Sequence, residues 1–320
     1  IKEKIMNKLL PITIFSLLFI IGCENFFGDR NDSGDPYAYD MLLYDLEQDL
    51  ALSSKQISDS KDFLRNGRDF FPDNASLWKL ASYLQQNLTQ EQKERLLSPP
   101  EDLISEEITE ENDYHHKRLR HHHRMDEFIR SILSADQLSD YNEMVTYKKD
   151  ALDEVYNDLK AGSQTKKEAY REMMGVMEWF RAAMDKLLTD DQKSLLEEMH
   201  KQKDDHWRKS KGGYGKHAKN HEKMKQEMYD VLVMSAEQIS TLESLEASFK
   251  SSLELLHDNF VNGVVDYTPE EYILSVGSII DSFHEDKITI FDTVQLEIIE
   301  IHRAIARRFM KHSRWGHKGR

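Results

Sequence analysis

The chain has 320 residues, of which 39% are hydrophobic and 32% are charged, and its formal net charge at pH 7 is −15. So acidic a composition excludes nucleic acid as the expected partner, because phosphate binding needs a basic surface. With one cysteine the chain cannot form an internal disulfide, so packing must supply its stability, and the high charged fraction favours exposed helices over a compact globule.

The N-terminus predicts a lipoprotein signal peptide over residues 1–22. Asn7-Lys8 precedes an apolar run from Leu9 to Ile21 that is too short for a permanent transmembrane helix. The run ends in Gly22-Cys23, which resembles a bacterial lipobox. This resemblance implies that Cys23 is lipidated and holds the chain in the cell envelope, facing the periplasm. Met6 is a more conventional initiator than Ile1.

After the lipidation site, residues 23–40 predict a flexible tether that is polar and contains glycine. Residues 41–312 predict a helical repeat domain, and 313–320 a basic tail. No proline lies between residues 101 and 268, which excludes a β protein rich in turns. We therefore expect an all-α fold.

Six short stretches repeat one pattern: an apolar residue, then Ser, Thr or Asp, then two further residues, then glutamine. A Ser, Thr or Asp three residues before Gln is the pattern of a capping box, which predicts a helix start at each copy. The glutamines lie 36, 45, 55, 46 and 57 residues apart. The copies predict about six motif-started helical hairpins. Their apolar, capping and glutamine residues are Leu52, Ser53, Gln56; Leu88, Thr89, Gln92; Leu133, Ser134, Gln137; Leu188, Thr189, Gln192; Met234, Ser235, Gln238; and Phe291, Asp292, Gln295.

Leu88-Thr89-Gln90-Glu91-Gln92 and Leu188-Thr189-Asp190-Asp191-Gln192 resemble the LTXXQ-motif family, the Spy/CpxP-type periplasmic chaperones and their zinc-associated relatives. The resemblance implies an all-helical cradle that binds unfolded clients without ATP, and possible homo-oligomers. Members typically carry two motifs and are about half as long. The best-known cradle is basic on its concave face, whereas this chain is acidic overall.

Apolar residues recur at helical spacing in two segments. One series is Leu242, Leu245, Phe249, Leu253, Leu256 and Phe260, and the other is Met177, Phe180, Met184 and Leu187. Most of these side chains are expected in a core. In a cradle some would stay on a concave face, where Met and aromatic residues adapt to irregular clients.

Two basic segments contain the histidines that could bind Zn²⁺ or Cu²⁺: His115, His116, His121, His122 and His123 in one, and His217 and His221 in the other. Carboxylate ligands would come from Glu110, Asp113, Asp204 or Asp205. Adjacent Lys and Arg oppose a divalent cation, so solvated basic hairpin tips are an alternative. Attraction to acidic client segments or anionic lipids is another.

The chain lacks a P-loop, a Gly-x-Ser-x-Gly, a His-Glu-x-x-His and a Cys-x-x-Cys-His sequence, so we expect no enzymatic activity. No cofactor is required, apart from the metal considered above. The first expected function is a membrane-tethered, ATP-independent periplasmic chaperone or envelope-stress protein that binds unfolded envelope proteins. The alternatives are a periplasmic metal sensor or buffer and a structural helical spacer.

Overall fold

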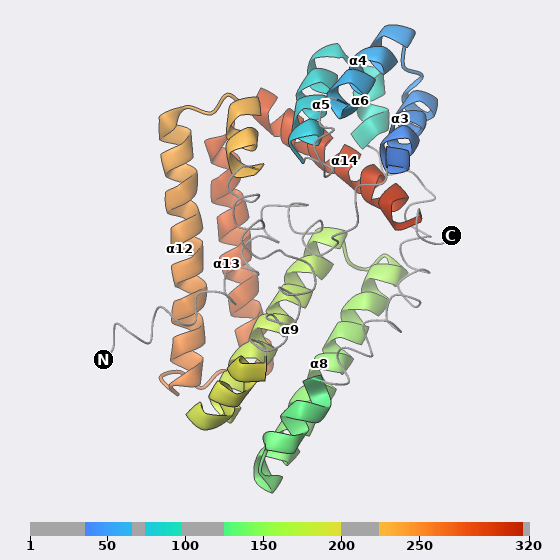
Figure 1. Cartoon of the computed structure of the whole chain (residues 1–320). Helices are drawn as coiled ribbons and strands as arrows, with labels where there is room; N and C mark the ends of the chain where they lie inside the picture. Colours follow the sequence, from blue (N-terminus) through green and yellow to red (C-terminus); the bar gives the residue numbers. More distant parts are fainter. Residues whose placement is uncertain (1–35, 66–73, 98–124, 200–223, 316–320) are drawn as a thin grey trace. The chain divides into compact units, whose positions relative to one another are not determined.

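The computed structural model describes residues 36–65, 74–97, 125–199 and 224–315 (Figure 1). These residues form α-helices joined by turns, and no strand occurs among them, so the all-α prediction is confirmed. Short helices also lie at residues 125–132, 190–199 and 224–231. The labelled helices are α3 (Pro36–Leu50), α4 (Ser54–Arg65), α5 (Asn74–Asn87), α6 (Gln90–Leu97), α8 (Ala135–Ala161), α9 (Lys166–Leu187), α12 (Ala236–Val261), α13 (Pro269–Ile290) and α14 (Thr293–Trp315).

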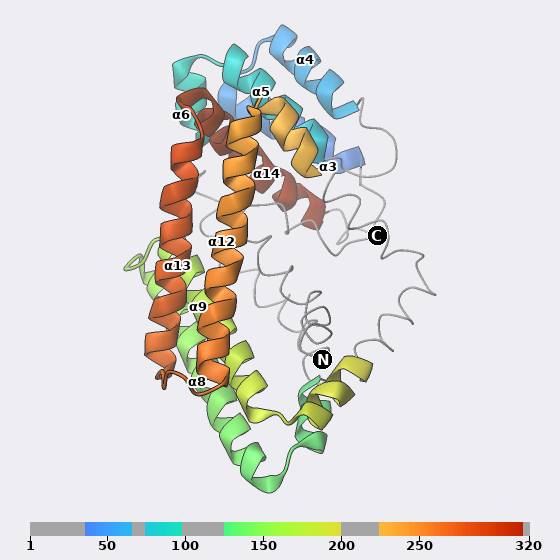
Figure 2. The same cartoon turned by 90° about the vertical axis from the view of Figure 1, so that its left-hand side faces the viewer.

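The first of two compact units combines the N-terminal helices α3 to α6 with residues from the C-terminal third of the chain. Helix α14 packs against α3, α5 and α6, and Figure 2 shows the same group of helices from a second side. Its apolar stripe includes Ile301, Ile305 and Phe309, all nearly or fully buried. The core of this unit is therefore assembled from segments far apart in the sequence.

The second unit contains α8, α9 and most of α12 and α13. Helices α8 and α9 run side by side (Figure 1). Aromatic pairs join α12 to α13, with ring centroids 4.7 Å apart for Phe249–Phe283 and 5.2 Å apart for Phe260–Tyr272. This hairpin buries Phe249, Leu256 and Phe260 of the apolar series predicted for α12, whereas Leu245 and Leu253 of that series are only partly buried.

The apolar series predicted for α9 is only partly buried. Met184 is buried, but Met177 is 49% exposed, and the helix instead buries Val176 and Trp179. The reason is that α9 has two packing partners. It packs along α8, and it approaches α13 so closely that a Cβ on Gly175 would lie 2.8 Å from Cγ2 of Ile273. A single stripe of period 3.6 cannot describe a helix that is covered on two sides.

Each motif copy lies at the corner between two consecutive helices. The first joins α3 to α4, and the second joins α5 to α6. The third and fourth begin α8 and the helix at 190–199, while the fifth and sixth begin α12 and α14. The prediction of about six hairpins over residues 41–312 stays a prediction, and residues 1–22 and most of the tether at 23–40 lie outside the described part of the chain.

Candidate functional site

All six motif copies form the predicted capping boxes. In each copy the backbone N–H of the capping Ser, Thr or Asp donates to Oε1 of the glutamine, over 2.9–3.0 Å. In return the backbone N–H of the glutamine donates to the side-chain oxygen of the cap, over 2.8–3.3 Å. Each box satisfies two backbone N–H groups that a helix start would otherwise leave unpaired.

The six glutamines also meet in three pairs, which we call the paired-glutamine clasps. The first clasp is Gln56 with Gln92, the second is Gln137 with Gln192, and the third is Gln238 with Gln295. The partners lie 36, 55 and 57 residues apart. Each clasp therefore joins two successive motifs, and the structural unit that repeats along the chain is a pair of motifs.

Each glutamine of a clasp also reaches the helix that ends just before its partner's motif. Its Nε2 donates to a backbone carbonyl there, over 2.7–3.0 Å. In the second clasp Gln137 donates to Leu187 O and Gln192 to Ile132 O; the other acceptors are Asn87 O for Gln56, Leu50 O for Gln92, Ile290 O for Gln238 and Leu232 O for Gln295. These carbonyls belong to helix C-termini, where no intrahelical donor remains. One side chain thus caps the start of its own helix and the end of another.

The second clasp uses every hydrogen-bonding position of both amides. Gln137 and Gln192 donate to each other's Oε1 over 2.9 Å in both directions. Each Oε1 also accepts from its own capping residue, and each Nε2 also donates to a carbonyl. A glutamine amide offers two donors and two acceptor lone pairs, so nothing is left unsatisfied. Turning either amide over would place an NH₂ group against the backbone N–H of the cap.

Two further capping boxes show why the motif requires glutamine. Thr165 with Glu168 begins α9, and Thr268 with Glu271 begins α13. Both have the reciprocal cap bonds, but neither carboxylate can donate to a second helix, because an ionised Glu is an acceptor only. A capping box alone accepts Glu or Gln equally. The amide is needed for the clasp, and this preference is the sequence signal that the glutamines do more than cap their own helices.

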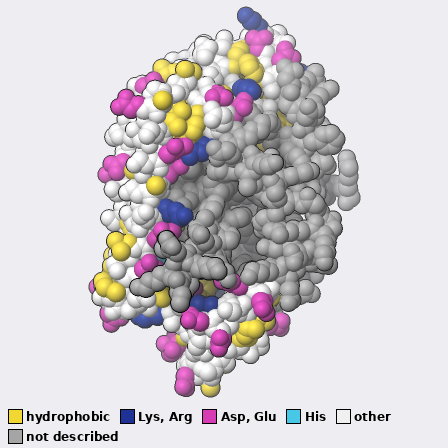
Figure 3. Space-filling view, turned by 60° about the vertical axis from the view of Figure 1, so that its left-hand side comes forward, with side chains coloured by type: hydrophobic (Ala, Val, Ile, Leu, Met, Phe, Trp, Pro, Cys, Tyr) yellow, Lys and Arg dark blue, Asp and Glu magenta, His cyan; other side chains and the backbone are white. Residues whose placement is uncertain are grey.

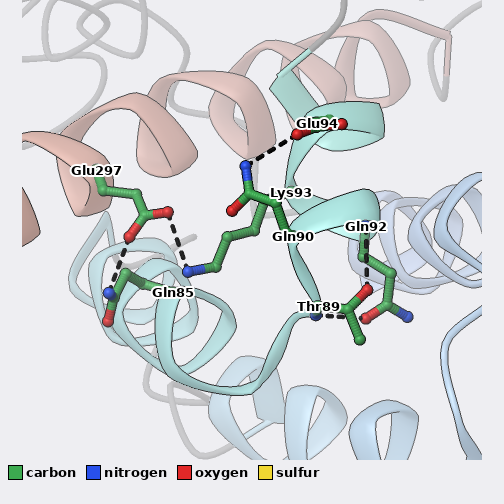
Figure 4. A network of polar contacts seen from close by, with 7 residues as sticks. All are labelled: Gln85, Thr89, Gln90, Gln92, Lys93, Glu94 and Glu297. Carbon is green, nitrogen blue, oxygen red and sulfur yellow. Dashed lines mark hydrogen bonds and ion pairs between the residues drawn. The ribbon is translucent and has the colours of Figure 1, made fainter.

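The lysine that follows the second motif also connects two motifs of the first unit. Lys93 occupies the position where four copies have an apolar residue, and its Nζ lies 3.0 Å from Oε1 of Glu297 on α14. Gln85 Nε2 donates to the other oxygen of Glu297 over 2.9 Å (Figure 4). Although burial raises the pKa of Glu297, these two partners together hold it below its usual value. The first and third clasps are therefore linked through α6 and α14.

A buried histidine lies in the same core. His302 on α14 stacks on Trp78 of α5, with ring centroids 3.7 Å apart and planes 5° from parallel. Burial, helped by the charge of Arg303, lowers the pKa of His302 to about 3. Its Nε2 and the Nε1 of Trp78 have no hydrogen-bond partner among the described residues. His302 is therefore a neutral packing residue at physiological pH.

Exposed apolar side chains occur on both units. Met173 and Met177, one turn apart on α9, are 39% and 49% exposed, and Leu274 on α13 is 71% exposed. Figure 3 shows acidic side chains lying among the hydrophobic ones on one face of the described surface. These apolar side chains can contact a partner without first requiring the protein to unfold.

The predicted lipidation and metal residues lie outside the described part of the chain. They are Cys23, His115, His116, His121, His122, His123, His217 and His221. Within the described ranges, no group of three or more His, Cys, Asp or Glu residues could hold a metal ion. In the same ranges, none of the helices is both long and apolar enough to span a bilayer.

Comparison with known proteins adds no relative. No protein-family model, no curated protein and no solved structure matches the chain.

Proposed function

We propose that this protein is a membrane-tethered, ATP-independent periplasmic chaperone, or an envelope-stress protein, that binds unfolded envelope proteins on apolar helical surfaces. The observation that carries the proposal is the pairing of six motifs into three clasps. Members of the LTXXQ-motif family, which the chain resembles, typically have two motifs. Three motif pairs in one chain are consistent with three copies of that two-motif set, two of them in the first compact unit and one in the second.

The exposed methionines on α9 support the client-binding part of the proposal. Met173 and Met177 lie on one face of the helix, since residues four apart are neighbours on a helix surface. Flexible thioether side chains fit irregular apolar partners better than branched ones do. Neither methionine is buried in the core of its own unit, so part of each side chain is available to a partner.

An aggregation assay tests the proposal. Residues 24–320 should suppress aggregation of a chemically denatured client at near-stoichiometric ratio and without nucleotide. Met173→Ser with Met177→Ser should weaken the suppression, while Lys167→Ser, an exposed polar change on the same helix, serves as a control. If the wild type gives no suppression across a tenfold range of ratios, the chaperone proposal is wrong.

The tether is tested separately. Cys23→Ser should convert a protein of the membrane fraction into a soluble or uncleaved one. If the variant still sediments with membranes after a high-salt wash, the lipid anchor is wrong, whatever the result of the aggregation assay.

A further inference from the structure

The third clasp differs from the other two at two exposed positions. Val233, just before the fifth motif, is 83% exposed, and Val294, inside the sixth motif, is 52% exposed. Each of these valines stands where the local structure favours a different type of residue.

Val233 occupies a backbone conformation that opposes its side chain. Its φ is +51°, in the left-handed region, where a β-branched residue is strained. The turn itself is regular: the N–H of Val233 donates to Asp230 O over 3.2 Å, and that of Met234 donates to Tyr229 O over 3.0 Å. The equivalent residue of the first clasp is Ala51, at φ +49°. Glycine would fit this position without strain, so folding does not explain a valine here.

Val294 breaks the rule for the second residue of a motif helix. The five other copies carry a charged residue at this position, and four of these are acidic, as suits the positive end of a helix dipole. They are Lys55, Glu91, Asp136, Asp191 and Glu237. Valine gains nothing from the dipole and exposes apolar surface to water.

One hydrogen bond joins the chain neighbours of the two valines. Gln295 Nε2 donates to Leu232 O over 2.9 Å. Val294 precedes Gln295 in the chain, and Val233 follows Leu232. The reciprocal bond, from Gln238 to Ile290 O over 2.8 Å, has the ordinary neighbours, the acidic Glu237 and the buried Phe291. The departures are thus confined to one side of one clasp.

The charges next to the valines are negative. Asp230 accepts the N–H of Val233 through its backbone carbonyl, and Asp292 lies two residues before Val294; both aspartates are exposed. A second copy of this chain, with its formal charge of −15, would add like charges to this end of the clasp. An apolar side chain flanked by cationic residues complements it.

We propose that Val233 and Val294 form a contact site for a polypeptide segment in which an apolar side chain is flanked by lysine or arginine. The proposal builds on the proposed function, and it names the class of client segment that this clasp takes. The first clasp, with Ala51 and Glu91 at the same two positions, has no such site.

The test is binding of a labelled peptide with a leucine–phenylalanine centre and lysine flanks, followed by fluorescence anisotropy. The same peptide with glutamate flanks is the comparison. The purified full-length chain should bind the lysine peptide, and 0.5 M NaCl should weaken the binding because salt screens the charges. Val233→Ser with Val294→Ser, which removes the apolar surface without changing the charge, should weaken it on the order of tenfold.

Equal binding of both peptides, or equal binding by wild type and the valine double variant, overturns the contact site. If that variant also suppresses client aggregation as wild type does, only the contact site is wrong. If wild type binds the lysine peptide through the valines yet suppresses no aggregation, the contact site stands and the chaperone function is wrong.

Discussion

Gln137 and Gln192 lie 55 residues apart, yet their side-chain amides form a closed pair in which each donates to the other's oxygen over 2.9 Å. The Oε1 of each amide also accepts the backbone N–H of the capping residue of its own helix. A fully satisfied polar pair has one favoured geometry, so it fixes how two helix corners meet more strictly than apolar packing does. The clasp therefore fixes the position of one helix corner relative to another, and the chain contains three such clasps.

The mutual dependence of the two amides predicts strong coupling. Gln137→Ala and Gln192→Ala should each destabilise the chain, and the double variant should lose less than the sum, by about 1 kcal/mol. Gln137→Ala combined with Glu168→Ala, whose capping box makes no clasp, should be additive within about 0.5 kcal/mol. Denaturant unfolding of the three single and two double variants measures both. Additivity in the Gln137–Gln192 cycle would mean that the pair is two independent caps.

Backbone strain at Val233 predicts a stabilising substitution. Val233→Gly should raise the free energy of unfolding by about 1 kcal/mol, because glycine adopts φ +51° without a steric penalty. Ala51→Gly, at φ +49°, should gain less, since alanine is not branched at Cβ. Thermal unfolding distinguishes the two. A loss of stability in Val233→Gly would show that its side chain supports the fold, which contradicts its assignment as a contact residue.

Burial of His302 predicts acid sensitivity. Its pKa is about 3 in the folded chain and about 6.5 when unfolded, so the unfolded state binds more protons between these values. The stability that the neutral imidazole contributes is complete above pH 6.5 and is lost as pH falls, by up to about 1.4 kcal/mol per pH unit. His302→Phe keeps a ring on Trp78 and should flatten the stability profile between pH 6.5 and 4. Parallel profiles for wild type and variant would contradict a neutral buried imidazole.

Two helical glycines of the second unit should respond differently to alanine. A Cβ on Gly175 would meet Cγ2 of Ile273 at 2.8 Å and its carbonyl oxygen at 3.0 Å, whereas one on Gly277 would meet the side chain of Arg171 at 3.4 Å. Gly175→Ala should therefore destabilise by about 1–3 kcal/mol through overpacking. Gly277→Ala should be neutral or stabilising by up to about 1 kcal/mol, because alanine favours the helix. The reverse order, measured by denaturant unfolding, would mean that α9 and α13 do not meet at Gly175.

Local chemistry made the helix starts predictable. Each capping residue and its glutamine lie three residues apart, so the hydrogen bonds that define the box depend on the sequence alone. The pairing of the glutamines was not predictable in this way. It depends on which two helix corners lie next to each other in the fold. Partners 36 to 57 residues apart are brought together by packing around helices such as α14. The buried positions of α9 were predicted incompletely for the same reason, because tertiary contacts determine which sides of the helix are covered.

The signal that separates the two kinds of box was nevertheless present in the sequence. Thr165-x-x-Glu168 and Thr268-x-x-Glu271 begin helices as well as any motif copy does, but only the copies with glutamine meet a partner. A repeated preference for Gln where Glu would cap equally well indicates that the amide has a second task.

The most direct test of this account is an exchange of Gln and Glu at two capping boxes. Gln295 is 5% exposed and donates to Leu232 O and to Gln238, whereas Glu271 caps Thr268 and has no clasp. Gln295→Glu keeps the cap but sets a carboxylate against a carbonyl, so the free energy of unfolding should fall by about 2–3 kcal/mol at neutral pH. Glu271→Gln should change it by less than about 0.5 kcal/mol. If both exchanges have the same small effect in denaturant unfolding, the glutamines are ordinary caps and the clasp does not organise the fold.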